Sequence, residues 1–260
     1  MTWALKRQIF YVGVLVLVIS VFSFLIISPR FNKPPTCFDS KQNGDETGID
    51  CGGSCARACP SQVDELSILW ARAFKVIPGR YNAVAYFENH NQDVVVQKIN
   101  YIFRFADANN VYIGKREGST YVPPSGRFAV FEPGIDIGNS IPVYVDFEFT
   151  ETPEWTTTPQ EKINQLQVLV SNINLVNEDT TPALSATIKN HSFFIVREID
   201  VIAILYDANR NAVSASRTYI DFLVAEESRD VHFTWPEPLP GQVVSIEIIP
   251  MYNIDLAQLK

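Results

Sequence analysis

The chain has 260 residues, and Lys6 and Arg7 are its only charged residues before Ser28. The remainder carries 19 basic and 29 acidic residues, a net charge of −10. A surface with this balance repels phosphate backbones and anionic headgroups, so we expect no nucleic-acid partner and no flat attachment to anionic lipid. After an N-terminal anchor, the length leaves room for one large domain or two domains of about 80 to 100 residues.

The first predicted element is a membrane-spanning helix over residues 9–27, preceded by a cytoplasmic N-terminus at residues 1–8. Its sequence, IFYVGVLVLVISVFSFLII, has no charge, and as a helix it reaches roughly 28 Å, close to the thickness of a bilayer core. The alternative is a cleaved signal peptide, but the run ends without a small-x-small cleavage site, which favours a retained anchor. Basic residues lie on both sides of the run, so the positive-inside rule favours a cytoplasmic N-terminus only slightly.

Residues 28–36 contain the basic, proline-rich sequence PRFNKPP, which predicts a stiff extended spacer with no helix continuing through it. Residues 37–60 form a predicted loop, in which glycines allow tight turns. All four cysteines of the chain lie in this loop: Cys37, Cys51, Cys55 and Cys59.

The four cysteines can form two disulfides or one zinc site. The three-residue gaps between the last three cysteines are atypical of zinc ligands. An even number of cysteines in a loop without a core, just beyond an anchor, favours disulfides, with three pairings open. An oxidised loop predicts that the C-terminal bulk lies outside the cytoplasm.

The same loop concentrates oxygen ligands that suit Ca²⁺. These residues are Asp39, Asn43, Asp45, Glu46 and Asp50. Their spacing matches no EF-hand, and the capping of turns explains the same residue types. Calcium at this loop is therefore the one cofactor hypothesis, and otherwise we expect no cofactor.

The order of residues from Cys37 to Cys55 resembles a loop, C-x-D-G-x-x-N-G-x-E-T-G-V-D-C-G-G-x-C, that recurs in exported, surface-attached bacterial proteins. This copy has Ser40 where the family usually has Gly, and Cys59 lies one residue further on than a C-x-x-C spacing would put it. The resemblance implies a location outside the membrane and no catalytic role.

An internal repeat with an offset of about 100 residues organises the rest of the chain. Each half reads as a strand, an Asn-His turn, a long strand, an Asp-Ala-Asn turn and a further strand. The matching segments are 83–91 with 184–192, and 99–111 with 199–213, followed by strands near 127–132 and 141–150 in the first half and 229–235 and 243–251 in the second. Six or seven short strands in each half predict a β-sandwich.

The segment 64–76 fits an amphipathic helix or a strand, and we favour a strand because the matching segment 165–176 alternates and is rich in β-branched residues. The predicted fold is therefore mainly β. It comprises two tandem immunoglobulin-like sandwiches, at residues 64–150 and 164–255, joined by an exposed Thr- and Pro-rich linker at residues 151–163.

The second half resembles the FxLYD-like sandwich domains of prokaryotic exported proteins through Ala203-Ile204-Leu205-Tyr206-Asp207, followed by Ala208-Asn209. The first half keeps Phe103 but has Phe105-Ala106 in place of Leu-Tyr. This resemblance implies the immunoglobulin-like fold and no activity.

Single residues in the repeats also allow predictions. The run from Val201 to Tyr206 is wholly apolar, as in a central strand covered on both faces, whereas Arg104 indicates a solvent-facing position. Asp107 and Asp207 fit turn formers better than metal ligands.

A partner-binding edge of exposed aromatic side chains is also predicted, and its candidates are Trp155, Tyr121 and Trp235. The indole of Trp235 also fits a cover over its own sandwich.

We expect the protein not to be an enzyme. His90 and His191 occupy equivalent turns, His232 alternates with apolar neighbours, and no catalytic motif is present. Asn190-His191-Ser192 is a formal glycosylation sequon.

The predicted function is a membrane-anchored binding or scaffolding protein outside the membrane, with an unassigned protein or glycan partner. The alternatives are a calcium-dependent adhesion module and an accessory subunit of an envelope enzyme.

Overall fold

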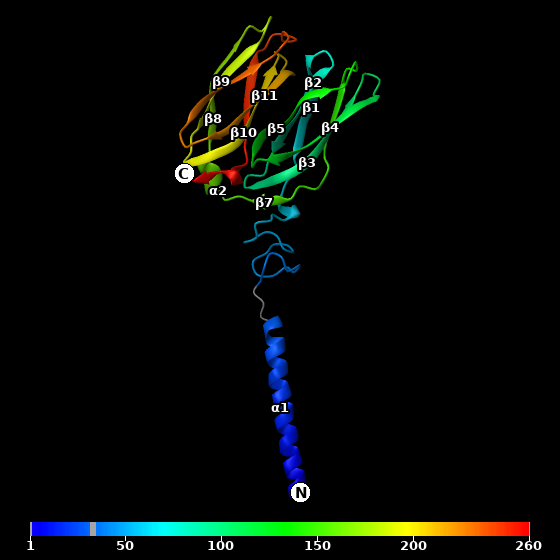
Figure 1. Ribbon diagram of the computed structural model, residues 1–260, viewed down its shortest axis with the longest axis vertical. Helices are drawn as coiled ribbons and strands as arrows, with labels where there is room; N and C mark the ends of the chain where they lie inside the picture. The colour runs from blue at the N-terminus through cyan, green and yellow to red at the C-terminus, as the bar shows by residue number, and fades with distance from the viewer. Residues whose placement is uncertain (1, 32–34, 260) are drawn as a thin grey trace. The chain divides into compact units, whose positions relative to one another are not determined.

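The computed structural model describes residues 2–31 and 35–259 (Figure 1). It divides into two compact units, Met1–Cys55 and Ala56–Lys260. The first unit holds helix α1 (Trp3–Phe31) and most of the cysteine-rich loop, and the second holds the β-strands.

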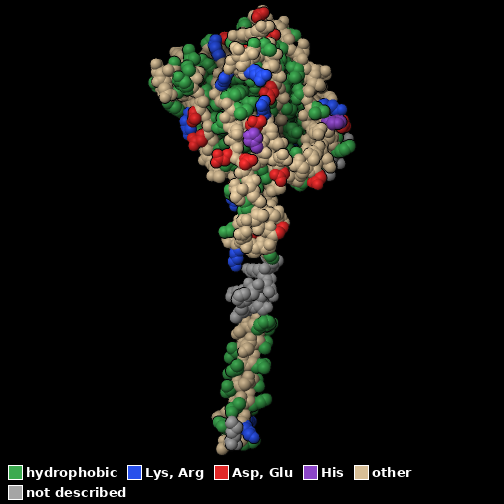
Figure 2. All heavy atoms as spheres, turned by 180° about the vertical axis from the view of Figure 1, so that it is seen from behind, with side chains coloured by type: hydrophobic (Ala, Val, Ile, Leu, Met, Phe, Trp, Pro, Cys, Tyr) green, Lys and Arg blue, Asp and Glu red, His purple; other side chains and the backbone are tan. Residues whose placement is uncertain are grey.

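Helix α1 contains a candidate membrane-spanning segment, Trp3–Ile26, in which an 18-residue apolar window has a mean hydropathy of 2.8 and is not buried against the protein. Hydrophobic side chains cover it in Figure 2. By length and composition it can cross a membrane, a property that signal sequences share.

The helix runs past its predicted end at Ile27 to Phe31, so the expected extended spacer over residues 28–36 is wrong for residues 28–31. Pro29 has no N–H to donate, but this forfeits only one helical hydrogen bond, and the helix ends two residues later. Residues 32–34 of the expected spacer lie outside the described residues.

The second unit is mainly β. The first half of the repeat contains η1 (Pro60–Gln62), β1 (Ser67–Ile77), β2 (Arg80–Asn89), β3 (Val94–Ala106), β4 (Tyr112–Val122), β5 (Gly126–Asp136), β6 (Tyr144–Phe149) and β7 (Trp155–Thr157). The second half contains α2 (Gln160–Gln165), β8 (Val168–Val176), β9 (Ala183–Asn190), β10 (Phe194–Tyr206), β11 (Ala212–Leu223), β12 (Ser228–Thr234), β13 (Ser245–Met251), η2 (Ile254–Leu256) and β14 (Gln258–Leu259).

Both halves have the same antiparallel topology. In the first half, the sheet β1-β2-β5 faces the sheet β4-β3-β6, and β7 pairs with the start of β3. In the second half, β8-β9-β12 faces β11-β10-β13, and β14 pairs with the start of β10. The structure therefore has the two expected tandem β-sandwiches, and the repeat extends to the seventh strand. The segment 64–76 lies mostly in β1, as favoured.

The segment 151–163 is not an exposed extended linker. It contains β7 and the start of α2, and Trp155 and Thr158 have exposed fractions of only 8% and 1%. Thr- and Pro-rich composition indicated a joint, but pairing with β3 satisfies the backbone of this segment and buries its tryptophan.

Each sandwich has its own core. In the first, the ring of Phe87 stacks on Phe128 at 4.9 Å between centroids and meets Phe147 edge to face at 5.0 Å. In the second, aliphatic side chains such as Leu184, Ile199 and Leu205 fill the space.

The two sandwiches also pack on each other, so that the outer face of β1-β2-β5 covers the outer face of β11-β10-β13 (Figure 1). Strand β10 is buried on both faces, as predicted. Val201, Ala203 and Leu205 lie in the second core, whereas Ile202 and Ile204 belong to the apolar cluster of the first sandwich.

Hydrogen bonds join the two sandwiches across this interface. Tyr86 Oη donates across the interface to Glu247 Oε1 at 2.6 Å, and within the second sandwich Tyr206 Oη donates to Glu247 Oε2 at 2.9 Å. Burial raises the pKa of both tyrosine hydroxyls above the ordinary value, and the Glu247 carboxylate raises it further. Arg72 Nη1 donates to the carbonyl oxygen of Ala212 at 3.2 Å.

Candidate binding site

The cysteine-rich loop is disulfide-bonded, as predicted. Cys37 pairs with Cys55 across a separation of 18 residues, and Cys51 and Cys59 are disulfide-bonded as well. Within the described residues, Cys37, Glu46 and Cys55 are close enough for their ligand atoms to meet one metal ion. Metal binding requires thiolates, and both sulfurs are consumed in the disulfide, so this trio is not a zinc site in the oxidised protein.

Two of the predicted calcium ligands, Asp39 and Asp50, instead accept hydrogen bonds that stabilise one turn of the loop. Asp50 Oδ1 accepts the backbone N–H of Asp39 at 2.9 Å, and its Oδ2 accepts that of Ser40 at 2.9 Å. Asp39 in turn accepts the backbone N–H of Lys41 at 3.0 Å and the amide of Asn43 at 2.9 Å.

The other two carboxylates have similar partners. Glu46 Oε2 accepts the backbone N–H of Asn43 at 3.1 Å, and Asp45 Oδ1 accepts the Ser54 hydroxyl at 2.8 Å. The backbone of this loop is tight, because a Cβ at Gly53 would clash with the carbonyl oxygen of Asp45. Hydrogen bonds within the loop thus account for the acidic residues, and calcium binding stays a prediction.

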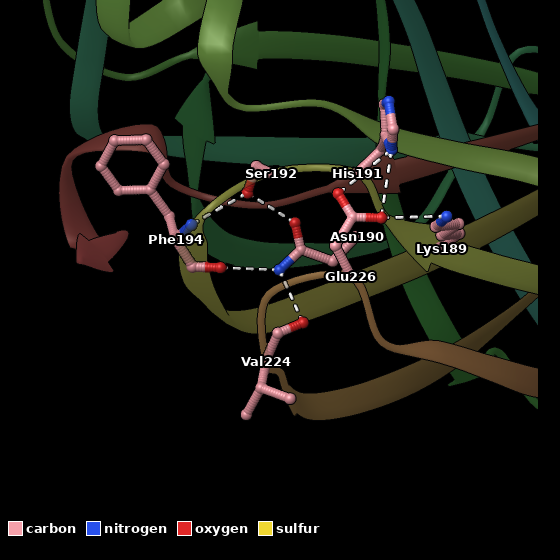
Figure 3. Close-up of polar contacts among 7 residues, drawn as sticks. All are labelled: Lys189, Asn190, His191, Ser192, Phe194, Val224 and Glu226. Atoms are coloured by element: carbon pink, nitrogen blue, oxygen red, sulfur yellow. Dashed lines mark hydrogen bonds and ion pairs between the residues drawn. The ribbon is translucent and has the colours of Figure 1, made fainter. Parts of the chain in front are cut away.

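The repeated Asn-His turn is built on its asparagine (Figure 3). Asn190 has an exposed fraction of 0%, and its Nδ2 donates to the carbonyl oxygens of Phe194 at 2.7 Å and Val224 at 3.0 Å. Its Oδ1 accepts the hydroxyl of Ser192 at 2.6 Å. The sequon asparagine is therefore enclosed in the folded chain.

His191 lies outside this cluster, with its side chain exposed and Nδ1 3.3 Å from Glu226 (Figure 3). Lys189 and then His191 hold the pKa of Glu226 below its ordinary value. His90 and His232 are also exposed, the latter as the predicted outward residue of its strand.

In the first half, the same turn also fixes a second segment. Asn89 Oδ1 accepts the backbone N–H of Asn91 at 3.0 Å. Asn91 then makes two reciprocal bonds with the backbone of Asp64, accepting its N–H at 2.8 Å and donating to its carbonyl oxygen at 2.8 Å. Residue 64 leads into β1, so this turn positions the chain at one end of the first sandwich.

A pocket of about 470 Å³ lies at this end, between the start of β1, the end of β6 and β7. We call it the β1–β7 pocket. Its apolar walls are formed by Val63, Leu66, Ile68, Phe149, Pro153 and Trp155, and its charged lining residues are Arg57, Asp64, Glu65 and Glu154.

Backbone pairing fixes the wall that carries Trp155. The N–H of Ala58 donates to the carbonyl oxygen of Trp155 at 3.0 Å, and that of Thr157 donates to Ala56 at 2.7 Å. Strand β7 in turn pairs with β3 (Figure 1).

The aromatic edge expected from the sequence is not exposed. Trp155 and Trp235 have exposed fractions of 8% and 7%, and Tyr121 is half-buried. Trp235 lies in the second core, as the alternative for this residue predicted. Trp155 still contributes to the pocket, but as part of its wall. Sequence reasoning missed the other lining residues, because short segments around residues 57–68 and 149–155 gave no common signal.

No family model and no curated protein matches the chain. Among solved structures, a transglutaminase from red sea bream is similar at 9% identity with a TM-score of 0.25, over 74% of this chain and 30% of the transglutaminase chain. The chain thus spans less than a third of that neighbour, and a likeness of this size carries no argument about activity.

Proposed function

We propose that the protein is a membrane-anchored binding or scaffolding protein that presents two joined β-sandwiches outside the cytoplasm, without catalysing a reaction. The observation that carries this proposal is the disulfide-bonded loop directly after an apolar N-terminal helix. Stable disulfides form in oxidising compartments and are rare in the cytosol, which supports an extracytoplasmic location for the loop and the chain beyond it.

The binding role is supported by the second unit. Two sandwiches joined by an apolar interface form a rigid support, and the β1–β7 pocket offers an apolar surface next to charged groups. The chain's histidines are exposed, and none lines this pocket.

The test is labelling of the four cysteines on intact cells with a membrane-impermeant maleimide, before and after an impermeant reductant. Labelling that requires reduction but not lysis is the expected result. Labelling that requires lysis would place the loop in the cytosol and overturn the proposal. Mass spectrometry of the membrane fraction should also find the N-terminal helix in the mature chain. Its absence would mean that the helix is a signal sequence that is cleaved, which would leave the chain without an anchor.

A further inference from the structure

We propose that the β1–β7 pocket binds a basic, apolar segment of a partner protein. An apolar side chain of that segment enters between Phe149 and Trp155, and neighbouring Lys or Arg side chains pair with the carboxylates of the pocket. This inference rests on the proposed binding function and names the chemistry of its partner.

The walls of the pocket favour an apolar side chain. The volume of about 470 Å³ lies within the range typical of binding sites. Ile68 remains 49% exposed beside the buried indole of Trp155, so a ligand would remove apolar surface from water.

The charges of the pocket favour a cation next to that side chain. Asp64, Glu65 and Glu154 are exposed, and Arg57 is the single basic residue that lines the pocket. Among the described residues, none forms an ion pair with these three carboxylates. The pocket therefore attracts Lys and Arg and repels acidic segments and anionic headgroups. The net charge of −10 from Ser28 onward acts in the same direction.

The walls are also held in place before any partner arrives. Asn91 fixes the backbone of Asp64 with two hydrogen bonds, and Ala58 fixes that of Trp155. Binding therefore costs little conformational entropy in the protein, so even a small contact area can give measurable affinity.

The experiment measures fluorescence anisotropy of a labelled peptide with a central Leu-Phe pair and Lys on both sides, added to the full chain in detergent micelles. We expect saturable binding that weakens with salt. A peptide with Glu in place of Lys, and one with Ser in place of Leu-Phe, should each bind at least about tenfold more weakly.

Two variants test the pocket itself. Ile68→Ser should weaken binding about tenfold, because it removes apolar wall. The control Leu169→Ser removes an apolar side chain of β8 that is 47% exposed and does not line the pocket, and it should leave binding unchanged. Glu65→Lys with Glu154→Lys should also weaken binding about tenfold, whereas Glu161→Lys with Asp221→Lys makes the same change in net charge away from the pocket.

Equal loss in the pocket and control variants, or equal binding of the Glu peptide, would overturn the proposal. Displacement of the peptide by a neutral oligosaccharide would identify a glycan site instead. If no peptide binds while cysteine labelling still requires reduction without lysis, the partner chemistry is wrong and the proposed location stands. If labelling requires lysis, the proposed function itself fails.

Discussion

Asn190 shows how much one enclosed side chain holds together. Its amide group donates to the carbonyl oxygens of Phe194, Leu223 and Val224, and all of these bonds are within 3.1 Å. Asn190→Ala would remove these three bonds from the interior of the fold, so we expect the free energy of unfolding to fall by about 3 kcal/mol. Urea denaturation measures this loss. His191→Ala is the matched control, because its exposed side chain should contribute less than about 0.5 kcal/mol.

The same pair of residues marks a limit of sequence reasoning. The repeated Asn-His pair predicted a structural turn, which the structure confirms, but both residues are polar and nothing in the pattern showed that only the asparagine is buried. Equal effects of the Asn190 and His191 substitutions would show that this distinction is wrong.

Gly118 is required by the side chains that face it. A Cβ there would lie 2.5 Å from Tyr101 Oη and 2.6 Å from Glu132 Oε1, two atoms that share a hydrogen bond of 2.8 Å. Gly118→Ala must push them apart, so we expect a loss of about 2 kcal/mol in the free energy of unfolding. Gly241→Ala has no atom within 4 Å of the new Cβ and serves as the control. Denaturation curves in which both variants match the parent would contradict this assignment.

The two halves of the repeat differ where they meet. Ile204 lies at the interface and is fully buried, whereas the matching Arg104 faces solvent and pairs with Asp146 at 3.0 Å. On the covering sheet, Val84 and Tyr86 are buried, and the matching residues of the second half are Ser185 and Thr187. Covered faces are apolar and uncovered faces are polar, so the differences between the halves specify which faces join.

Exchanging these residues tests that rule. Ile204→Arg places an unpaired charge in the interface, and we expect the free energy of unfolding to fall by about 4 kcal/mol. Arg104→Ile on the open face loses only exposed ion pairs and should change it by less than about 1 kcal/mol. Tryptophan fluorescence during urea denaturation measures both. Similar losses would mean that the interface does not stabilise the second unit.

Elements of different length were predictable to different degrees. Long alternating strands such as β3 and β10 were evident from their pattern, and the apolar run in β10 correctly indicated cover on both faces. The pattern does not say what provides the cover, so the contact between the sandwiches was not predicted. Strands β7 and β14 were missed because two or three residues carry no periodicity. Trp155 was therefore assigned to an exposed linker.

At the scale of the whole chain, local signals were predictable and assembled sites were not. The four cysteines lie within one short loop, and their disulfide bonding followed from count and context. The β1–β7 pocket joins residues 57–68 to residues 149–155, which are distant in sequence and are brought together only by the folding of β1, β6 and β7. Its carboxylates look like ordinary surface residues until the walls beside them are known.

The division into two compact units predicts how the chain responds to loss of one disulfide. Cys37–Cys55 closes a loop that has almost no apolar core, and a crosslink over a separation of 18 residues stabilises a loop by about 3 kcal/mol through chain entropy. Cys37→Ser with Cys55→Ser should therefore open residues 38–54 to protease, as limited proteolysis with mass spectrometry would show.

The second unit has its own cores and sheets, so its unfolding midpoint in urea should remain that of the parent. Trp70, Trp155 and Trp235 lie within the second unit and allow its transition to be followed by fluorescence. A lower midpoint would show that the loop stabilises the sandwiches. An unchanged midpoint together with rapid cleavage would show that the disulfide maintains the segment between helix α1 and the sandwiches without contributing to the fold of the second unit.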